Sequence, residues 1–225
     1  MAKLLIISGY GATDLATGKK GAFYNTMEEL HKYWDRIDII CPSLQGKSPV
    51  QIFSNVFFHP CPHSIILQPA WIYRKGTEIY NEQKFDVITV HEYPPFYNGM
   101  GAMMLSRKLK VPRIEEFHHI VGYPKSANIK EMFYKFLSLI FANFLTSQSA
   151  AVRVVNNTQV SYFLEKSGVN KRKIHYVPSL YIDKKIFNSQ ESLKSFDLIF
   201  IGRLVHNKGI KLFMDVGISQ QKRRR

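Results

Sequence analysis

Short apolar segments alternate with helical segments along most of the chain, and this alternation limits the fold more than any other feature. Each apolar segment has the length of a buried strand, and the stretch after it repeats apolar residues every three or four positions. Parallel strands joined by helices bury both faces of their sheet. The pattern therefore predicts an α/β fold with a doubly wound parallel sheet. The predicted strands are residues 3–8, 37–41, 55–59, 85–90, 113–117, 151–155 and 173–177.

The helices between these strands are predicted at residues 23–34, 69–81, 99–109, 129–145 and 157–167. Helix 129–145 is apolar on most sides, but Lys130, Glu131 and Lys135 interrupt it. It is therefore short of the roughly 20 apolar residues that span a bilayer. We expect this helix either to lie in the core or to rest on a membrane surface.

Polar side chains follow two of the predicted strands where these strands end. His91, Glu92 and Tyr93 follow strand 85–90, and His118 and His119 follow strand 113–117. Ligands of open α/β sheets bind at the carboxyl ends of the strands. We expect these side chains to shape a binding pocket. The alternative is that they only cap their strands or are structural histidines.

A further apolar segment, residues 196–201, breaks at Gly202 and resumes as a helix near Ile210. The loop between them holds Arg203 and Lys208. Free backbone N–H groups at a helix start, together with two cations, attract phosphate groups. The segment thus predicts a phosphate-binding loop, with a strand end and a solvated arginine as the alternative.

The charge of the chain indicates the chemistry of its partners. Lys and Arg number 31 against 17 Asp and Glu, which gives a net charge of +14. This balance favours nucleotides or anionic lipid head groups, although solubility alone would also explain it. No zinc-ligand spacing, aromatic-basic motif or helix-turn-helix pattern indicates a nucleic-acid partner. Cys41 and Cys61 each stand beside a proline and predict buried thiols in a reducing compartment, so we expect a cytoplasmic protein without a metal site.

Several segments, in order, resemble the N-terminal half of the retaining glycosyltransferases of the GT-B architecture, known as glycosyltransferase group 1 or family 4. Residues 202–209, Gly-Arg-Leu-Val-His-Asn-Lys-Gly, are similar to the Gly-Arg-Leu…Lys-Gly signature of that family. Residues 173–187 resemble the stretch that leads into its interdomain linker, and residues 151–168 resemble its penultimate βα unit. The resemblance covers residues 1–217 approximately.

The resemblance implies a Rossmann-like fold and three parts. Residues 1–180 would form an acceptor-side Rossmann-like domain, residues 181–195 a linker, and residues 196–225 the first strand and helix of an incomplete donor-binding domain with a basic tail. The implied reaction moves a hexosyl group from a nucleoside-diphosphate sugar to a glycan or lipid-linked acceptor with retention, without a cofactor or metal. Family members carry a pair of glutamates beyond this loop that has no counterpart here, so we expect a truncated enzyme that binds its donor poorly alone.

The resemblance also implies roles for single residues. One of the two adjacent histidines would contact the transferred sugar, which makes two catalytic candidates, His118 and His119. The acceptor would be contacted by His91, Glu92 and Tyr93. The phosphates of the donor would be bound by Gly18, Gly21, Gly202, Arg203 and Lys208.

Two other functions are compatible with parts of the sequence. A non-catalytic basic Rossmann-like binding module, or one subunit of a split transferase with a complementary C-terminal subunit, would share the fold and could touch a membrane peripherally. A dinucleotide-dependent oxidoreductase is suggested by Gly9 and Gly11 after the first strand. This last function is disfavoured because Asp14 stands where the third glycine is needed, and strand 37–41 ends without an acidic residue for a ribose.

Overall fold

The computed structural model describes residues 2–9, 11–12, 15, 20–42, 51–178, 195–202, 204 and 208–223. Within these residues the chain forms an eight-stranded sheet in the order β3-β4-β2-β1-β5-β6-β7-β8. All strand pairs are parallel except β3 with β4. The strands are β1 (Lys3–Ile7), β2 (Arg36–Cys41), β3 (Gln51–Ile52), β4 (Val56–Pro60), β5 (Val87–His91), β6 (Arg113–Phe117), β7 (Ala151–Val154) and β8 (Ile174–Tyr176).

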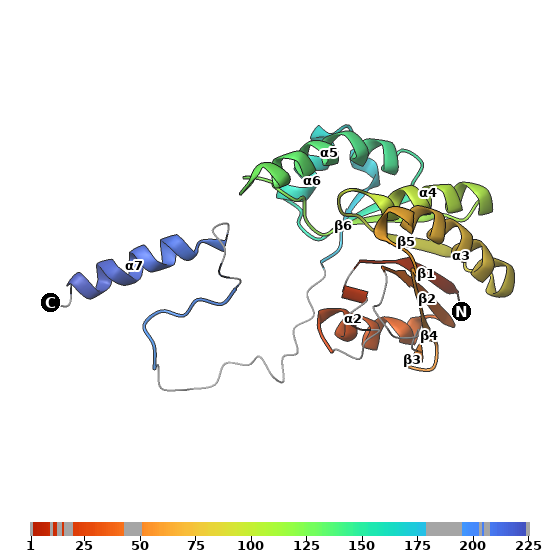
Figure 1. Ribbon diagram of the computed structural model, residues 1–225, viewed down its shortest axis with the longest axis horizontal. Helices are drawn as coiled ribbons and strands as arrows, with labels where there is room; N and C mark the ends of the chain where they lie inside the picture. The colour runs from red at the N-terminus through yellow and green to blue at the C-terminus, as the bar shows by residue number, and fades with distance from the viewer. Residues whose placement is uncertain are drawn as a thin grey trace.

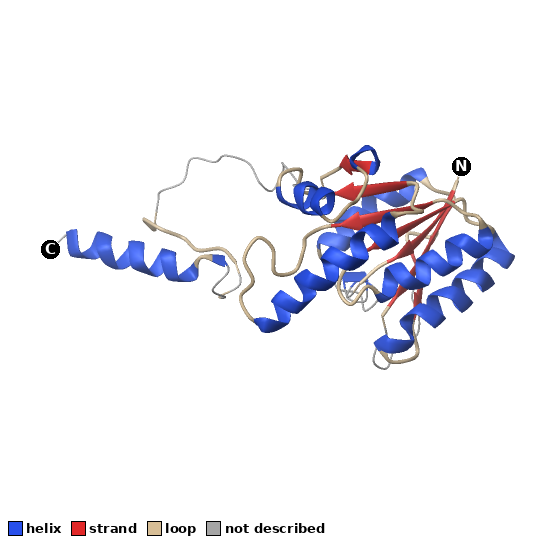
Figure 2. Ribbon diagram, turned by 90° about the horizontal axis from the view of Figure 1, so that it is seen from above, coloured by secondary structure: helices blue, strands red, loops and turns tan. Residues whose placement is uncertain are grey.

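Helices cover both faces of this sheet (Figures 1 and 2). They are α2 (Ala22–Leu30), α3 (Gln68–Gln83), α4 (Tyr97–Leu109), α5 (Ile129–Thr146), α6 (Gln159–Lys166) and α7 (Ile210–Arg223). Three 3₁₀ turns add η1 (His31–Tyr33), η2 (Ile65–Leu67) and η3 (Lys171–Lys173). None of the described helices is both long and apolar enough to cross a membrane.

The two faces of the sheet are filled by alternate residues of the same strands. In β1, Leu4 and Ile6 pack with Met27 of α2, whereas Leu5 and Ile7 pack with α3 and α4 on the other face. This follows from the two-residue period of a strand, and each fully buried aliphatic side chain contributes about 1.5–3 kcal/mol. A third cluster joins β6 and β7 to α5 and α6. The predicted doubly wound sheet is therefore confirmed.

Two glycines let α3 and α4 approach closely. A Cβ atom on Gly76 would lie 2.3 Å from Cδ2 of Leu105, and one on Gly101 would lie 2.9 Å from the backbone of Pro69. No side chain larger than hydrogen fits at either position without moving a neighbour. The close contact holds the helix pair firmly on β1 and β5.

The sheet reverses its winding between β1 and β5. From β1 the chain moves outward to β2 and β4, and it then returns to the other edge of β1 as β5 before continuing to β8. Such a reversal opens a crevice at the carboxyl ends of the two central strands. The fold therefore brings Ser8 and Gly9, which follow β1, beside His91 and Tyr93 at the end of β5.

The predicted strand at residues 196–201 is wrong, because residues 195–201 have no regular secondary structure. A strand needs a neighbour to pair its backbone groups, and the described residues offer none here. Ile201 is 92% exposed. Helix α7 lies apart from the sheet (Figure 1) and continues to Arg223, into the basic tail. The antiparallel strand β3 was not predicted, because its two residues are too short to form an apolar pattern.

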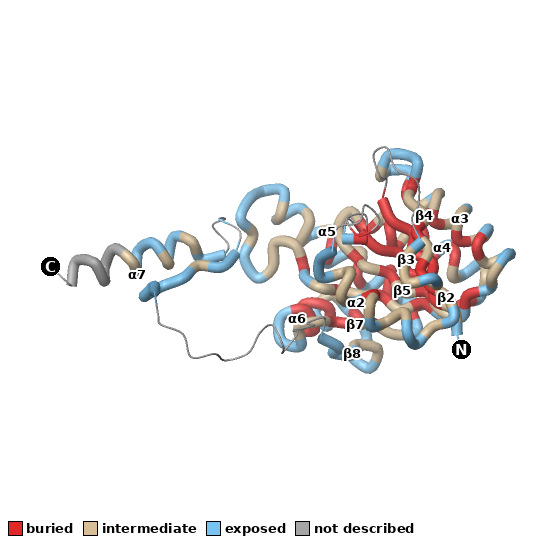
Figure 3. Tube along the Cα trace, turned by 90° about the horizontal axis from the view of Figure 1, so that it is seen from below, coloured by how far each residue is buried: buried red, intermediate tan, exposed pale blue. Residues whose placement is uncertain are grey.

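The other predicted strands and helices agree with the structure to within a few residues at their ends. Cys41 and Cys61 are both buried, as predicted. Figure 3 shows the buried residues concentrated in the sheet and on the inner sides of its helices. Gly18, Arg203 and most of the predicted linker, residues 181–194, lie outside the described residues.

Candidate functional site

The floor of the crevice is built from the ends of β1 and β5. The side-chain amide of Asn98, in the first turn of α4, donates to the carbonyl oxygen of Ser8 at 3.3 Å and to that of His91 at 3.2 Å. The ring of Tyr93 covers Gly9, where a Cβ atom would lie 3.1 Å from Cε1 of the ring. Glycine at position 9 thus lets the aromatic ring close over the end of the first strand.

His91 and His118 form a stacked pair above this floor. Their ring centroids lie 4.2 Å apart with an interplanar angle of 27°. The ring of Tyr93 stands against His91 at 5.9 Å and 70°. Because β5 and β6 are neighbours, the two histidines that follow their apolar segments meet at one edge of the sheet. The sequence predicted both histidines but not their contact.

Three polar residues, His91, Glu116 and Arg153, lie side by side on the neighbouring strands β5, β6 and β7. His91 pairs with Glu116 in the β5–β6 register, and Glu116 pairs with Arg153 in the β6–β7 register. Nη1 of Arg153 lies 2.7 Å from Oε2 of Glu116, and Nε2 of His118 lies 3.3 Å from the same oxygen. Arg153 also donates to the carbonyl oxygen of Val177 at 3.2 Å.

The carboxylate of Glu116 orients His118. Burial would raise the pKa of Glu116, but the hydrogen bond with His118 and the charge of Arg153 outweigh burial and lower this pKa. Glu116 is therefore an acceptor at neutral pH. The contact of Nε2 of His118 with this carboxylate fixes the ring and leaves Nδ1 as its other polar atom, on the side away from Glu116.

His91 is held in its neutral form. Burial, together with the nearby His118, lowers its pKa from 6.5 to about 4. Its Nε2 atom is buried, and no described group forms a hydrogen bond with it. A buried polar nitrogen without a partner is costly, so a ligand hydroxyl that reached it would gain a hydrogen bond at a position already desolvated.

Glu92 is not an open binding residue, which corrects the expectation that it lines the pocket with His91 and Tyr93. Successive residues of an extended chain point to opposite sides, so its side chain faces the interior and is only 2% exposed. A Cβ atom on Gly99 would lie within 2.1 Å of its Oε1 atom. Burial and the adjacent Glu115 carboxyl raise the pKa of Glu92 well above its usual value.

Glu92 belongs to a buried ionic cluster under the crevice. Nε of Arg113 lies 2.7 Å from Oε1 of Glu115, and Nη2 of Arg113 donates to the carbonyl oxygen of Leu145 at 2.6 Å. With one arginine for two buried carboxyl groups, Glu92 is best stabilised as the neutral acid. The cluster is structural and ties β5 and β6 to the end of α5.

The structure distinguishes the two adjacent histidines. His118 is half-buried and takes part in the ring stack and the contact with Glu116. His119 is exposed on the neighbouring position. His118 is therefore the better placed of the two catalytic candidates, and the catalytic role itself stays a prediction.

The predicted donor-phosphate residues are not assembled within the described residues. Gly21 is the N-cap of α2, Gly202 adopts a φ of 158°, and Lys208 is an exposed residue before α7. Gly18 and Arg203 lie outside the described residues. Their contacts with a phosphate group stay predictions.

Sequence reasoning missed Glu116, Arg153 and Asn98. Glu116 and Arg153 are opposite charges that interrupt two short apolar strands. Such charges indicate a cross-strand pair only once the order of the strands is known.

A surface hollow lined by Arg107, Lys110 and Gln148 lies at the amino edge of β6, away from the crevice. Among the described residues, no group of three or more His, Cys, Asp or Glu side chains is placed to hold a metal ion.

Comparison with known proteins matches the region that builds this site. The sequence model of Glycosyltransferase Family 4 matches residues 22–180, which is more than half of the chain. The mannosylfructose-phosphate synthase of Agrobacterium fabrum (strain C58) is 23% identical over 155 residues, covering 60% of this chain and 34% of that protein. The chain thus spans about a third of the length of this curated relative.

Solved structures share the fold. HepE of Anabaena in complex with UDP-glucose superposes with a TM-score of 0.52 at 13% identity, over 80% of this chain and 44% of that one. The UDP-GlcNAc 2-epimerase of Methanocaldococcus jannaschii gives a TM-score of 0.44 at 16% identity, over 78% and 45% of the two chains. At 13% identity the similarity to HepE concerns the Rossmann-like GT-B fold alone, and this chain spans less than half of either structure.

Proposed function

This chain belongs to glycosyltransferase family 4, and we propose that it supplies the acceptor-side domain of a retaining hexosyltransferase. In the proposed reaction, an acceptor hydroxyl oxygen forms a bond to the anomeric carbon of a nucleoside-diphosphate sugar. The bond from that carbon to the diphosphate breaks, the diphosphate leaves with the electron pair, and its departing oxygen takes up the proton of the acceptor hydroxyl. The acceptor is a glycan or a lipid-linked glycan, and no cofactor is proposed besides the donor substrate.

One observation carries this proposal, namely the stacked pair of His91 and His118 at the crevice between the carboxyl ends of the central strands. The pKa of His91 is lowered to about 4, and its buried Nε2 has no hydrogen-bond partner among the described residues, which suits a hydroxyl group better than a charged ligand. The ring of Tyr93 beside His91 offers an apolar surface to the face of a sugar.

The proposed roles follow from these positions. His118, oriented by Glu116, contacts a hydroxyl of the transferred sugar, while His91 and Tyr93 contact the acceptor. Cations stabilise the charge that develops on a departing diphosphate. We propose that Arg203 and Lys208 serve this purpose, with the backbone at Gly18, Gly21 and Gly202 approaching the phosphates.

The test separates binding from transfer. Histidine side-chain NMR resonances are followed while the chain is titrated with UDP- and GDP-hexoses and with saccharide acceptors. Hexose transfer is then assayed with the chain alone and with a family 4 donor domain supplied in trans. We expect His118→Asn to reduce transfer by about 10- to 100-fold, the loss of one hydrogen bond to a charged or polarised group. The matched neighbour variant, His119→Asn, should change it less than about threefold.

Three outcomes are informative. Transfer that His118→Asn reduces and His119→Asn spares supports the proposal. Saccharide binding at His91 and His118 without transfer, even when a donor domain is supplied, supports the binding module instead. If no sugar moves the resonances of either histidine and no hexose is transferred, the proposal is wrong.

A further inference from the structure

One face of α5 is exposed and mostly apolar along the helix, with Asn143 as a polar residue near its C-terminal end. The exposed fraction of its apolar side chains runs from 41% at Leu139 to 80% at Ile129. They recur every three or four residues and therefore form a single stripe. We call it the α5 outer stripe, and it consists of Ile129, Met132, Phe133, Phe136, Leu139, Ile140 and Phe144.

The stripe is not needed for the hydrophobic core. The side of α5 that packs on the domain carries Ser138, Ala142 and Leu145, which are buried, and through it α5 contacts α4 and α6. At about 100° per residue, these positions fall on the side of the helix opposite to the stripe. The helix therefore serves the core with one face and offers a second apolar face outward, where Figure 3 shows exposed and intermediate residues along α5.

Such a contiguous apolar surface is unusual for a side of a domain that only meets water. Exposed apolar residues are normally scattered, and contiguous ones mark a binding surface for a protein or a membrane. Three of the seven residues are phenylalanine, and the others are isoleucine, methionine and leucine. Large apolar side chains of this kind enter the boundary between head groups and acyl chains.

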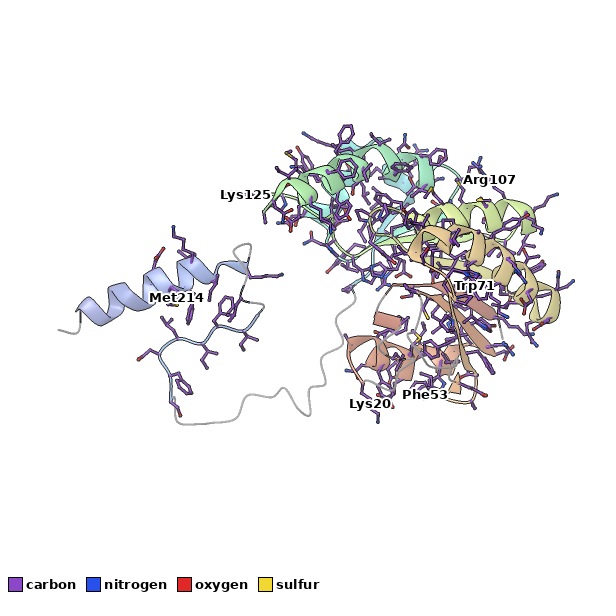
Figure 4. The ribbon with its side chains drawn as sticks, in the orientation of Figure 1. Lys20, Phe53, Trp71, Arg107, Lys125 and Met214 are labelled. Carbon is purple, nitrogen blue, oxygen red and sulfur yellow. The ribbon has the colours of Figure 1, made fainter. Side chains whose placement is uncertain are left out.

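The charges around the stripe favour an anionic surface. Lys130 and Lys135 lie on its two flanks, and Lys125 precedes the helix at the end labelled in Figure 4. The acidic residue of the helix, Glu131, accepts a hydrogen bond from the backbone N–H of Ala127 at 2.7 Å and so belongs to the helix start. Long lysine side chains can extend past an apolar face and place their ammonium groups at head-group level. The net charge of +14 adds attraction at longer range.

We propose that the α5 outer stripe docks this chain on the surface of an anionic lipid bilayer. The helix lies in the plane of the interface, with its apolar stripe among the upper acyl chains and its lysines against the head groups. A second copy of the chain is a poorer occupant, because a face-to-face contact of two such stripes would bring like-charged lysines together.

Docking through the α5 outer stripe would also place the crevice relative to the bilayer. α5 begins shortly after His118 and His119, and residues 120–128 connect the end of β6 to the start of the stripe at Ile129. A chain docked through the stripe therefore holds the histidine edge of the sheet near the bilayer. If the proposed function holds, this position suits an acceptor whose sugar is anchored by a lipid. The docking itself does not depend on that function.

The test measures co-sedimentation of the full chain with vesicles of phosphatidylcholine alone and of equal parts phosphatidylcholine and phosphatidylglycerol. We expect binding to the anionic vesicles that weakens as salt is added. Phe133→Ser with Phe136→Ser should lower the partition coefficient at least tenfold, since each exposed phenylalanine loses its apolar insertion. The matched control replaces two exposed apolar residues of η2, Ile66→Ser with Leu67→Ser, and should change it less than about twofold.

Two further variants test the parts of the proposal separately. Lys130→Gln with Lys135→Gln should lower binding by about fivefold per lysine and flatten the salt dependence. In the Ile140→Trp variant, the emission of the new tryptophan should shift to shorter wavelength when anionic vesicles are added. Circular dichroism of every variant shows whether the fold persists, and the lysine and tryptophan variants decide the matter if the phenylalanine pair does not fold.

The opposing results are equally specific. A wild-type chain that stays in the supernatant with anionic vesicles overturns the proposal, as does equal loss in the phenylalanine variant and the η2 control. A dimer in analytical ultracentrifugation that the phenylalanine substitutions dissociate, without vesicle binding, would assign the stripe to a second copy instead. Because vesicle binding needs no donor sugar, its failure can be told apart from failure of the transferase proposal.

Discussion

The imidazole rings of His91 and His118 stack with their centroids 4.2 Å apart, although the two residues stand at the ends of two different strands. His91 stays uncharged because burial and the proximity of His118 lower its pKa to about 4. Glu116 accepts from His118 on the other side, at 3.3 Å. The edge of the crevice thus presents two imidazole rings held in a fixed orientation.

The pH dependence of stability should report on His91. Its pKa is lower in the folded state, so the unfolded chain binds more protons between about pH 4 and 6.5, and stability falls as the pH falls through that window. We expect a loss of about 2 kcal/mol between pH 7 and pH 5 from this group. Urea unfolding at several pH values measures it. His91→Phe, which keeps a stacked ring without titrating, should remove this part of the slope.

The exposed His63 provides the control for that experiment. His63→Phe makes the same ring substitution at an exposed site, and its slope between pH 5 and pH 7 is compared with that of His91→Phe. An unchanged slope in His91→Phe would instead show that the burial of His91 does not govern its protonation.

Arg153 should matter because it neutralises the half-buried carboxylate of Glu116. Replacing it in Arg153→Met takes this cation away and should cost about 1–2 kcal/mol of unfolding free energy. Adding Glu116→Gln should recover part of this loss, since the carboxylate charge is then gone, and the double-mutant cycle measures the coupling. Arg172→Met, at an exposed position, should change stability by less than about 0.5 kcal/mol. Additive losses in the cycle would contradict the ion pair.

The buried cluster should tolerate loss of one carboxyl group but not of its arginine. Because the pKa of Glu92 is raised well above its usual value, Glu92→Gln replaces a neutral acid by a neutral amide. It should cost less than about 1 kcal/mol at pH 7, whereas Arg113→Leu should cost about 3–5 kcal/mol by leaving buried carboxyl groups without a cation. Chemical denaturation of both variants measures the difference. A larger loss for Glu92→Gln than for Arg113→Leu would show that Glu92 is the ionised member.

Close packing of α3 on α4 leaves no room for a side chain at Gly76. In an exposed helix, Gly→Ala would stabilise by about 1 kcal/mol. At Gly76 the new methyl group would lie 2.3 Å from Leu105, so Gly76→Ala should instead destabilise by about 1–3 kcal/mol through overpacking. Thermal unfolding measures the sign, which is the decisive quantity. Arg74→Ala, at an exposed position of α3 two residues earlier, should stay within about 0.5 kcal/mol.

Much of the fold could be predicted from the sequence because apolar segments of strand length report burial directly. Segment 113–117 was predicted with its observed ends, and the polar residues after strands 85–90 and 113–117 were placed at the ligand-binding edge. The alternation of side chains along a strand could also have separated Glu92 from His91. Residues 196–201 show the limit, because they form no strand and the described part of the chain offers them no strand to pair with.

The amino-acid sequence thus indicates most of the strands and helices, which faces are apolar, and which histidines reach the edge of the sheet. Which of these side chains meet depends on how the elements pack. The stack of His91 on His118 and the pair of Glu116 with Arg153 depend on strand order and register. The outward stripe of α5 depends on which side of the helix the core needs. Periodicity is a local property of the chain, whereas strand neighbours are set by long-range packing, and the site is made of contacts between neighbours.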